Sequence, residues 1–168
     1  MEKRTIFITR GLPACGKSTY SKEYVLKDQK TKRINRDDLR TMLSGYILTW
    51  NNEHLVLDIE ETMIKKTLLY GFNVISDNTY IKGKHLTNLI KLVREIEMEN
   101  PNFFINIVLV DFTDVSFETC VERDSKRERP VGREVIEGFN KMLNDPNNSF
   151  NDIYATFLEE RDEKRKTL

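Results

Sequence analysis

Short runs of apolar and β-branched residues alternate along this chain with longer stretches in which apolar residues recur every three or four positions. The short runs predict buried strands, and the longer stretches predict amphipathic helices. The predicted strands are residues 5–9, 32–35, 72–76 and 103–111. The predicted helices are residues 17–26, 37–44, 53–70, 84–97, 117–126 and 134–143, with a last helix from residue 153. This alternation indicates an α/β protein whose parallel sheet carries helices on both faces.

The length and composition bound the domain organisation. At 168 residues the chain is long enough to bury its own core, and no repeat or linker divides it, so we predict one domain over residues 1–168. The segment EERDEKRKTL is nearly all polar, and we predict that residues 159–168 form a solvated tail. The formal net charge is +0, so affinity for nucleic acid would need a local basic patch.

Cysteine usage and hydropathy bear on the compartment. Cys15 and Cys120 lack the spacing of metal ligands, and we interpret both as reduced thiols of a cytoplasmic protein. The sequence shows neither a signal peptide nor an apolar run of membrane length, so we expect no membrane partner.

The first predicted strand runs into GLPACGKS, which matches the phosphate-binding pattern G-x-x-x-x-G-K-[ST] between a strand and a helix. Glycines let the backbone approach a phosphate, and free N–H groups and the helix dipole attract it. Lys17 would reach the outer phosphates, and the Ser18 hydroxyl would ligate Mg²⁺. The alternative is a glycine-capped turn with a solvated lysine, which the complete motif disfavours. The predicted nucleotide-binding residues here are Gly11, Pro13, Ala14, Cys15, Gly16, Lys17, Ser18 and Thr19.

Kinases and nucleotide-dependent switches or binding modules share such a loop. A guanine-nucleotide switch would carry D-x-x-G and N-K-x-D segments, but Asn140-Lys141 is followed by Met142-Leu143 and lacks the aspartate. This counts against a switch and favours a kinase, which needs an acceptor base and cations around the transferred phosphoryl group.

The segment INRDDLR supplies a candidate acceptor site. Asp37 lies at the start of a predicted helix, and Arg40 follows three residues later on the same face. Asp37 could take the proton of a hydroxyl acceptor while Arg40 holds a phosphate that the acceptor carries. Spacing alone leaves open a helix cap and a surface ion pair.

Two further aspartates follow apolar strands, at the edge where open α/β sheets bind ligands. Asp77 in FNVISDNTY could hold Mg²⁺ through water or steady the acceptor, with a turn-forming Asp-Asn pair as the alternative. Asp111 has a similar position but ranks lower, because we expect its strand on the far side of the first one.

The densest basic cluster lies between two predicted helices. It consists of Arg123, Lys126, Arg127, Arg129 and Arg133. Arg123 and Arg127 share a helix face, and a proline and a glycine break the helix after them. A mobile basic segment of this kind is typical of a lid that clamps phosphates, although a solvated charged face is the alternative.

Four segments, in this order, resemble phage polynucleotide 5′-kinases. They are GLPACGKSTYSKEY, INRDDLR, ISDNTYI, and ERDSKR followed by RPVGREVIEGFNKM. The resemblance spans residues 4–145. The first segment is common to many P-loop enzymes, whereas R-D-D-x-x-R followed by S-D-N-T and S-K-R is far more specific.

The resemblance implies a P-loop kinase fold with sheet order 2-3-1-4. It implies transfer of the γ-phosphate of ATP or another nucleoside triphosphate to the 5′-hydroxyl of DNA or RNA. Lys17 and Ser18 would then bind the donor phosphates and Mg²⁺. Arg127 would be the lid cation on the donor phosphates, and Arg123 would support the nucleotide.

On the acceptor side, the resemblance implies that Asp37 is the general base. It implies that Arg40 clamps the neighbouring phosphate of the acceptor, with Asp77 close by. The loop SKRERPVG differs from the lid of the relative, which leaves the roles of Arg129 and Arg133 open.

The best-known phage relative also carries a phosphatase domain with a D-x-D-G-T motif. That motif is absent from these 168 residues, so we expect phosphatase activity to lie on another chain or to be absent. A separate phosphatase or ligase partner is left open. A phage-encoded chain would act in the cytoplasm of its bacterial host, and a homo-oligomer is left open. Two alternatives stay open as well: a kinase of this fold for a small molecule or nucleoside, and a nucleotide-dependent binding module without turnover.

Overall fold

The computed structural model describes residues 1–45 and 47–166. Four strands form one parallel sheet in the order β2-β3-β1-β4, which confirms the predicted fold class and strand order. The strands are β1 (Glu2–Arg10), β2 (Thr31–Ile34), β3 (Asn73–Ser76) and β4 (Phe103–Asp111). The helices are α1 (Lys17–Lys27), α2 (Arg36–Ser44), α3 (Trp50–Leu69), α4 (Gly83–Glu99), α5 (Phe117–Ser125), α6 (Arg133–Leu143) and α7 (Phe150–Lys166).

Strand β1 is central in the sheet and longer than the apolar run that predicted it. It pairs with the whole of β4, from Glu2 opposite Phe103 to Arg10 opposite Asp111, and with β3 on its other side. Because β4 is equally long, its backbone groups bond the polar ends of β1 as well as the apolar middle. The apolar run in the sequence therefore predicted too short a strand.

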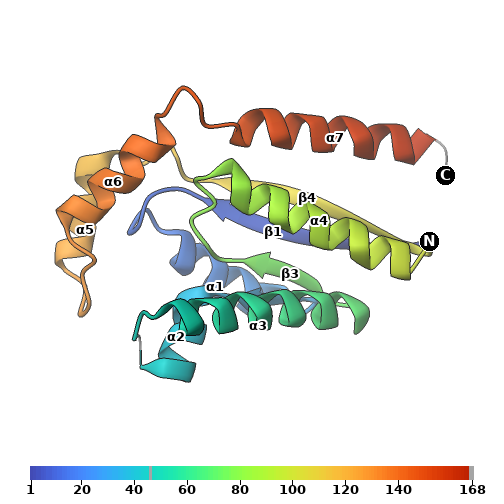
Figure 1. The fold of residues 1–168 in the computed structure, drawn as a ribbon, viewed down its shortest axis with the longest axis horizontal. Coiled ribbons are helices and arrows are strands. Elements are labelled where there is room, and N and C mark those ends of the chain that lie inside the picture. Colours follow the sequence, from blue (N-terminus) through green and yellow to red (C-terminus); the bar gives the residue numbers. More distant parts are fainter. Residues whose placement is uncertain (46, 167–168) are drawn as a thin grey trace.

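Side chains of β1 alternate between the two faces of the sheet. Ile6 and Ile8 are fully buried in the main core, which α3, α4 and α7 complete. Phe7 points to the other face, where its ring lies 5.2 Å from that of Tyr24 in α1. Helices thus cover both faces, with α4 in front of the sheet and α1 behind it (Figure 1). None of the helices in the described ranges is long and apolar enough to cross a membrane.

A second, smaller apolar cluster joins α5 and α6 to the end of the sheet. Leu12 and Cys15, in the loop after β1, pack there with Cys120 of α5 and Ile136 of α6. Both cysteines are free thiols, as expected. Burial raises the pKa of the Cys120 thiol, so it stays protonated at neutral pH. This cluster ties α5 to the loop after β1.

Side chains close the outer edge of β4. The Glu97 carboxylate of α4 accepts the Ile105 N–H at 2.7 Å. The Tyr154 hydroxyl of α7 accepts the Leu109 N–H at 3.1 Å and donates to the Ile107 carbonyl at 3.3 Å. An open strand edge can pair with another chain. Here α4 and α7 occupy those backbone groups.

Helix α7 corrects the predicted solvated tail. Residues 159–166 are helical, and residues 167–168 lie outside the described part of the chain. Arg161 is 5% exposed, and its Nη1 lies 2.8 Å from each oxygen of Glu97. Lys164 reaches the same carboxylate at 2.8 Å. The polar composition hid this contact because a buried ion pair uses the same residue types as a solvated tail.

We expect Glu97→Gln to lower the free energy of unfolding by about 3–5 kcal/mol, because the buried Arg161 guanidinium loses its counter-charge. Burial disfavours the carboxylate, but hydrogen bonds from Arg161, Lys164 and the Ile105 N–H outweigh it and hold the pKa of Glu97 below its ordinary value. The wild type should therefore lose stability as the pH falls below 4.5 towards the folded pKa. The variant should lose less over the same range. Urea denaturation at several pH values measures both effects.

Glu160→Gln is the matched control, because Glu160 pairs with Arg94 at 2.7 Å on the surface. Exposed pairs contribute about 0–1 kcal/mol, so this change should have a small effect. Equal losses in the two variants would contradict a special role for Glu97.

Candidate active site

The loop between β1 and α1 adopts backbone conformations that few side chains tolerate. Gly11 and Gly16 have φ values of +149° and +114°, and Ala14 has a φ of +63°. A Cβ at Gly11 would lie 2.9 Å from the Cys15 sulfur and 3.0 Å from the Phe112 Cβ. Both the backbone conformation and the close packing therefore require glycine at position 11.

Lys17 extends from the start of α1 back into this loop. Its ammonium donates to the carbonyl oxygens of Gly11 at 2.9 Å and Leu12 at 2.6 Å, and the side chain is buried. The N-cap of α1 is Gly16, which has no side chain to bond the first N–H groups of the helix. The loop thus places a cation and a helix N-terminus around one point, an arrangement suited to phosphate.

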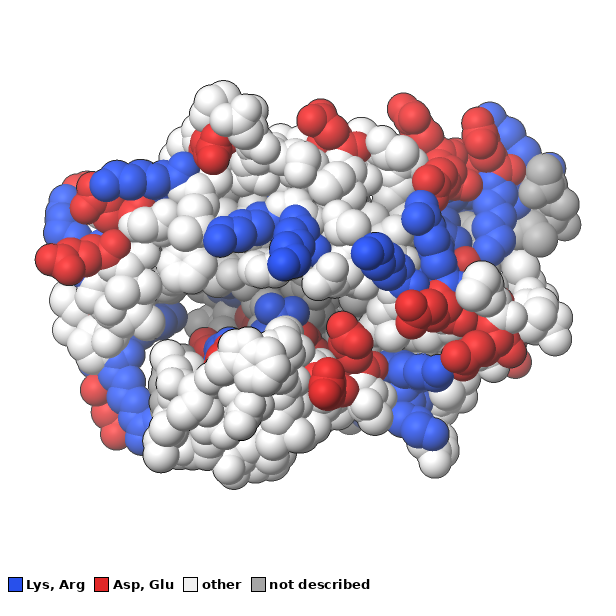
Figure 2. Space-filling model, in the orientation of Figure 1, with Lys and Arg blue, Asp and Glu red and all other residues white. Residues whose placement is uncertain are grey.

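A pocket of about 530 Å³ lies where this loop and α1 face α5, a volume typical of small-molecule sites. The residues that line it are Ala14, Gly16, Ser18, Thr19, Tyr20, Glu23, Arg123 and Arg127. The fold therefore brings two cations of the predicted basic cluster to the predicted phosphate loop. In the space-filling view, the surface is hollowed between the part formed by α5 and α6 and the part formed by α2 and α3 (Figure 2).

The two cations that line the pocket have different surroundings. Arg123 donates to the Cys15 carbonyl oxygen at 3.2 Å, which ties α5 to the loop. Arg127 lies 3.6 Å from the Asp124 carboxylate and remains 45% exposed. Arg129 is not among the residues that line the pocket. Of the two lining cations, Arg123 therefore contacts the phosphate loop, whereas Arg127 contacts the helix that precedes it.

Asp124, which no sequence pattern singled out, holds the segment between α5 and α6. Its two carboxylate oxygens accept the backbone N–H groups of Val131 at 3.2 Å and Gly132 at 2.9 Å. Lys126 and Arg133 pair with glutamates of α5 and do not line the pocket. The predicted cluster therefore divides into pocket cations and surface pairs.

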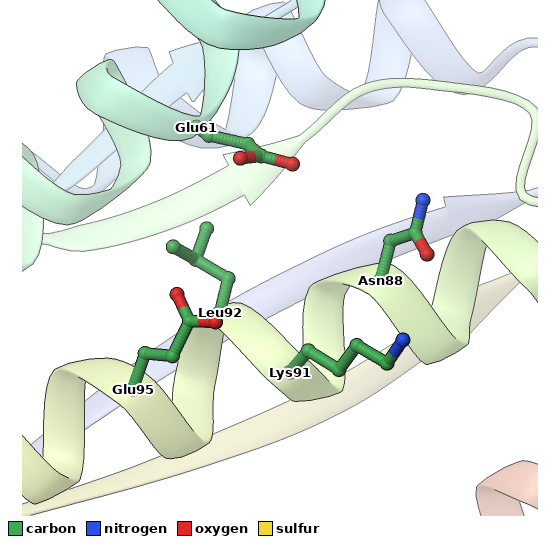
Figure 3. Close-up of a pocket in the computed structure, with 5 residues that line it drawn as sticks. All are labelled: Glu61, Asn88, Lys91, Leu92 and Glu95. Atoms are coloured by element: carbon green, nitrogen blue, oxygen red, sulfur yellow. The ribbon is translucent and has the colours of Figure 1, made fainter.

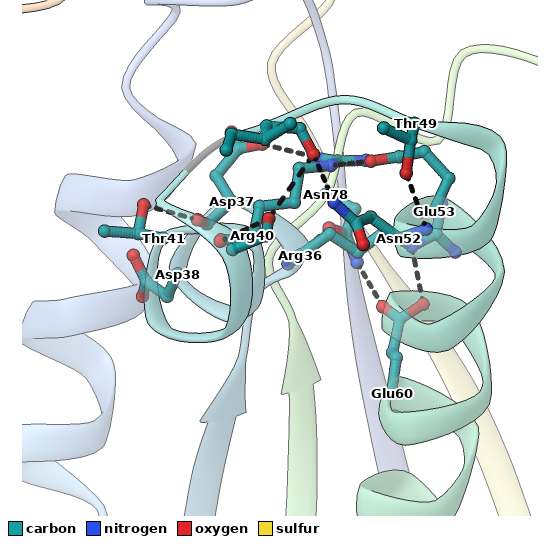
Figure 4. A network of polar contacts seen from close by, with 12 residues as sticks. Arg36, Asp37, Asp38, Arg40, Thr41, Thr49, Asn52, Glu53, Glu60 and Asn78 are labelled. Atoms are coloured by element: carbon teal, nitrogen blue, oxygen red, sulfur yellow. Dashed lines mark hydrogen bonds and ion pairs between the residues drawn. The ribbon is translucent and has the colours of Figure 1, made fainter.

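Arg40 of α2 binds two carboxylates (Figure 4). Its Nη1 lies 2.5 Å from Asp37 Oδ1, the pair that the spacing predicted. Its Nε and Nη2 donate to the two oxygens of Glu53 in α3, at 2.7 and 2.8 Å. Hydrogen bonds to Glu53 outweigh burial and raise the pKa of Arg40 above its ordinary value. These contacts use three of the five guanidinium N–H groups, so others can still bind a further anion.

Asn35, and not Asp37, caps α2. The Asn35 side chain accepts the Asp38 N–H at 2.9 Å. Asp37 lies in the first turn with a side chain that is 61% exposed, so a solvent-borne acceptor can reach its carboxylate. The helix-cap alternative is therefore excluded for Asp37. The contact with Arg40 and the exposure of Asp37 also fit the other alternative, a surface ion pair.

Asp77 follows β3 at the carboxyl edge of the sheet and is 1% exposed. It pairs with Arg33 of β2, whose Nη2 lies 2.6 Å from Oδ2. Its other oxygen, Oδ1, is buried and has no hydrogen-bond partner in the described part of the chain. The Asp77 carboxylate can therefore accept a water, but its cation is Arg33 and not Arg40.

A buried network anchors the start of α2 (Figure 4). Glu60 of α3 is 2% exposed, and its two oxygens accept from Arg36 at 2.5 Å and Asn78 at 2.6 Å. Asn78 also accepts the Arg36 backbone N–H at 3.2 Å. A sequence signal existed for Glu60, because it lies between Val56 and Ile64 on the buried face of α3. A charge at such a position requires a buried partner.

The residues predicted to hold Mg²⁺ fit that ion. Mg²⁺ takes oxygen ligands, keeps several waters, and is commonly bound by one or two protein groups together with substrate phosphates. The Ser18 hydroxyl lines the pocket beside the phosphate loop. The buried Asp77 Oδ1, which has no hydrogen-bond partner among the described residues, would suit a hydrogen bond from a metal-bound water.

The chain is similar to known proteins in sequence. Residues 6–146 match the family model described as AAA domain. Over 148 residues the chain is 24% identical to L-seryl-tRNA(Sec) kinase of Methanococcus maripaludis, a match that covers 86% of this chain and 54% of that protein. The chain therefore spans about half the length of this curated relative.

Two solved structures share the fold. A chain of the Pnkp1/Rnl/Hen1 RNA repair complex superposes with a TM-score of 0.72 at 24% identity, over 85% of this chain and 45% of that one. Fungal RNA kinase superposes with a TM-score of 0.64 at 13% identity, over 84% of this chain and 34% of that one. At these identities the likeness establishes a P-loop kinase-like fold.

We expect Gly11→Ala to weaken binding of a nonhydrolysable ATP analogue at least tenfold and to lower the melting temperature. The added Cβ would meet Cys15 and Phe112 at 3.0 Å or less, and alanine disfavours a φ of +149°. Fluorescence titration and thermal melting measure the two effects.

Gly138→Ala in α6 is the control, because nothing lies within 4 Å of a Cβ built there. Replacing a helical glycine by alanine stabilises by about 0.5–1 kcal/mol, so this variant should melt higher and bind the analogue normally. Normal binding by Gly11→Ala would show that the loop is not the donor site.

Proposed function

The chain belongs to the AAA domain family, and from that premise we propose that it is a polynucleotide 5′-hydroxyl kinase. It transfers the γ-phosphate of ATP or another nucleoside triphosphate to the 5′-hydroxyl of DNA or RNA. The observation that carries the proposal is the pairing of Asp37 with Arg40 at the sheet edge that also bears the phosphate loop. A proton acceptor beside a phosphate-binding cation suits an acceptor that has both a hydroxyl and a phosphate.

On the donor side, the triphosphate lies in the loop after β1. Arg123 and Arg127 line the pocket around it, and Lys17, whose ammonium is held by the loop carbonyl oxygens, adds a third cation within the loop. These cations balance the charge that develops on the transferred group. Ser18, and Asp77 through a water, would hold Mg²⁺, which would supply further neutralisation of the phosphate charges. The glycines permit the backbone conformation of the loop, and close packing of Gly11 on Cys15 and Phe112 supports it. The loop therefore need not reorganise during transfer.

On the acceptor side, Asp37 accepts the proton of the 5′-hydroxyl as the hydroxyl oxygen attacks the γ-phosphorus. The bond from the γ-phosphorus to the β,γ-bridging oxygen breaks in the same step, and the nucleoside diphosphate leaves. Arg40 holds the phosphate on the 3′ side of the same nucleotide. Glu53 binds the Arg40 guanidinium through two hydrogen bonds, which fixes its plane without using all of its donors. Glu53 is thus a positioning residue.

The similar proteins support a nucleic-acid acceptor. The names of all three refer to RNA: an RNA repair complex, a fungal RNA kinase and a seryl-tRNA kinase. For this chain we propose 5′-hydroxyl ends of RNA or DNA as acceptors. We further propose that a separate ligase or phosphatase acts on the same ends.

The direct test is transfer of labelled γ-phosphate from ATP to a panel containing a nucleoside, a nucleoside 3′-monophosphate, oligonucleotides, serine, seryl-tRNA and small alcohols. We expect the oligonucleotides to be labelled best. Asp37→Asn should retain ATP binding and lose about 10²–10⁴-fold in turnover, because its amide cannot accept the proton. Asp38→Asn is the control and should lose far less. Equal losses of turnover in the two variants would indicate that Asp37 only forms a surface ion pair and is not the base.

The preference for a phosphate-bearing acceptor should depend on Arg40. A charge-assisted contact contributes about 1.5–3 kcal/mol, so a nucleoside 3′-monophosphate should exceed the nucleoside roughly ten- to hundredfold in kcat/KM. Arg40→Ala should erase most of this ratio, and Glu53→Gln should reduce it in part, because the guanidinium is then held less firmly. If the wild type labels nucleosides or small alcohols as well as oligonucleotides, a small-molecule kinase is the better description. If ATP binds and no acceptor is labelled, the chain is a binding module.

A further inference from the structure

Lysines lie along the exposed side of α4, outside the site described above. Lys82 immediately precedes the helix, Lys84 is its second residue, and Lys91 follows Lys84 by about two turns on the same face. All three side chains are exposed, and none has an ion-pair partner among residues 1–45 and 47–166. We call these three residues the α4 lysine strip. Lysine and arginine side chains are seen along this part of the surface, above the hollow (Figure 2).

The start of the strip lies at the sheet edge that also carries the proposed base. Strands β2 and β3 are parallel neighbours, so the segments that follow them begin at the same edge of the sheet. The segment after β2 leads into α2 with Asp37, and the segment after β3 leads through Asp77 and Lys82 into α4. Arg36 in the first turn of α2 is paired with the buried Glu60, so the lysines supply the positive charge of the strip.

The far end of the strip is acidic. A small pocket of about 190 Å³ between α3 and α4 is lined by Glu61, Asn88, Lys91, Leu92 and Glu95. The Lys91 side chain points along α4 towards Asn88 and away from Glu95 (Figure 3). The glutamates limit the favourable path for a polyanion to about the first two turns of α4.

The start of α4 is also held firmly in place. A Cβ at Gly83 would lie 2.6 Å from the Ser149 hydroxyl oxygen and 2.9 Å from the Ile153 Cδ1. The helix therefore packs directly on the segment that leads into α7. Lys82 makes no side-chain cap hydrogen bond, so its amine does not stabilise the helix end. The strip displays its charges on a rigid support.

We propose that the α4 lysine strip carries the backbone phosphates of the acceptor strand beyond the one held by Arg40. The inference rests on the proposed function and specifies its substrate class: a strand several nucleotides long rather than a mononucleotide. Exposed lysines are mobile point charges without a fixed hydrogen-bonding plane, so they suit phosphates of any sequence. The strip therefore increases the affinity for the acceptor strand and directs its backbone along α4, without a preference for particular bases.

The test compares a nucleoside 3′-monophosphate with a 5′-hydroxyl oligonucleotide of about ten nucleotides, because only the longer acceptor reaches the strip. The double variant Lys82→Ala/Lys84→Ala should lower the ratio of oligonucleotide to mononucleotide kcat/KM roughly three- to tenfold. Two lost single-strand phosphate contacts should also flatten the slope of log affinity against log salt by about 1.4.

Lys27→Ala is the control, since this exposed lysine ends α1, at the opposite edge of the sheet from the phosphate loop. Lys27→Ala should leave the kcat/KM ratio of the two acceptors and the salt slope as in the wild type. The charge-conserving variant Lys82→Arg/Lys84→Arg should keep most of the wild-type ratio and slope. The proposal would be wrong if the alanine variant kept the wild-type kcat/KM ratio and salt slope. It would also be wrong if kcat/KM fell equally with the oligonucleotide and the mononucleotide. Failure of the wild type to label any acceptor would instead overturn the proposed kinase function.

Discussion

Parallel pairing of β1 with both β3 and β4 is the constraint from which the site follows. Parallel neighbours cannot be joined by tight turns, so a crossover segment must return the chain to the same end of the sheet before each new strand. Every strand then delivers its following loop to one edge. The phosphate loop, Asp77 and the start of α2 meet there, although up to 66 positions separate Gly11 from Asp77.

Buried ion pairs fix the positions of neighbouring elements relative to one another. They join β2 to the segment after β3, α2 to α3, and α4 to α7. Asp77, Glu60 and Glu97 are each under 9% exposed, and each binds one arginine from another element. A buried pair of this kind gains little over apolar packing, but losing one partner is costly. The pairs therefore specify position more than they add stability. Glu60 in particular fixes the residue before Asp37, whose own carboxylate stays open to solvent.

Most of the fold could be predicted because strand and helix periodicities depend on neighbours along the chain. The sheet order was predicted, and the strands and helices were predicted within three residues at each boundary except the end of α7. Four of the predicted loop residues line one pocket with Arg123 and Arg127, namely Ala14, Gly16, Ser18 and Thr19. The errors lie where a distant partner decides the outcome. β1 is extended by pairing with β4, and the supposed tail is helical because Arg161 meets Glu97.

The phosphate loop, the Asp37–Arg40 spacing and the helix faces are local properties, readable from the order of residues alone. The partners of the charges are not local. No sequence pattern singles out Glu53, yet the packing of α3 on α2 brings its carboxylate to Arg40. Likewise Asp77 meets Arg33 because β2 and β3 are neighbours. Coulomb interactions depend on distance in space, and only the packing of helices and strands sets those distances between residues remote in sequence.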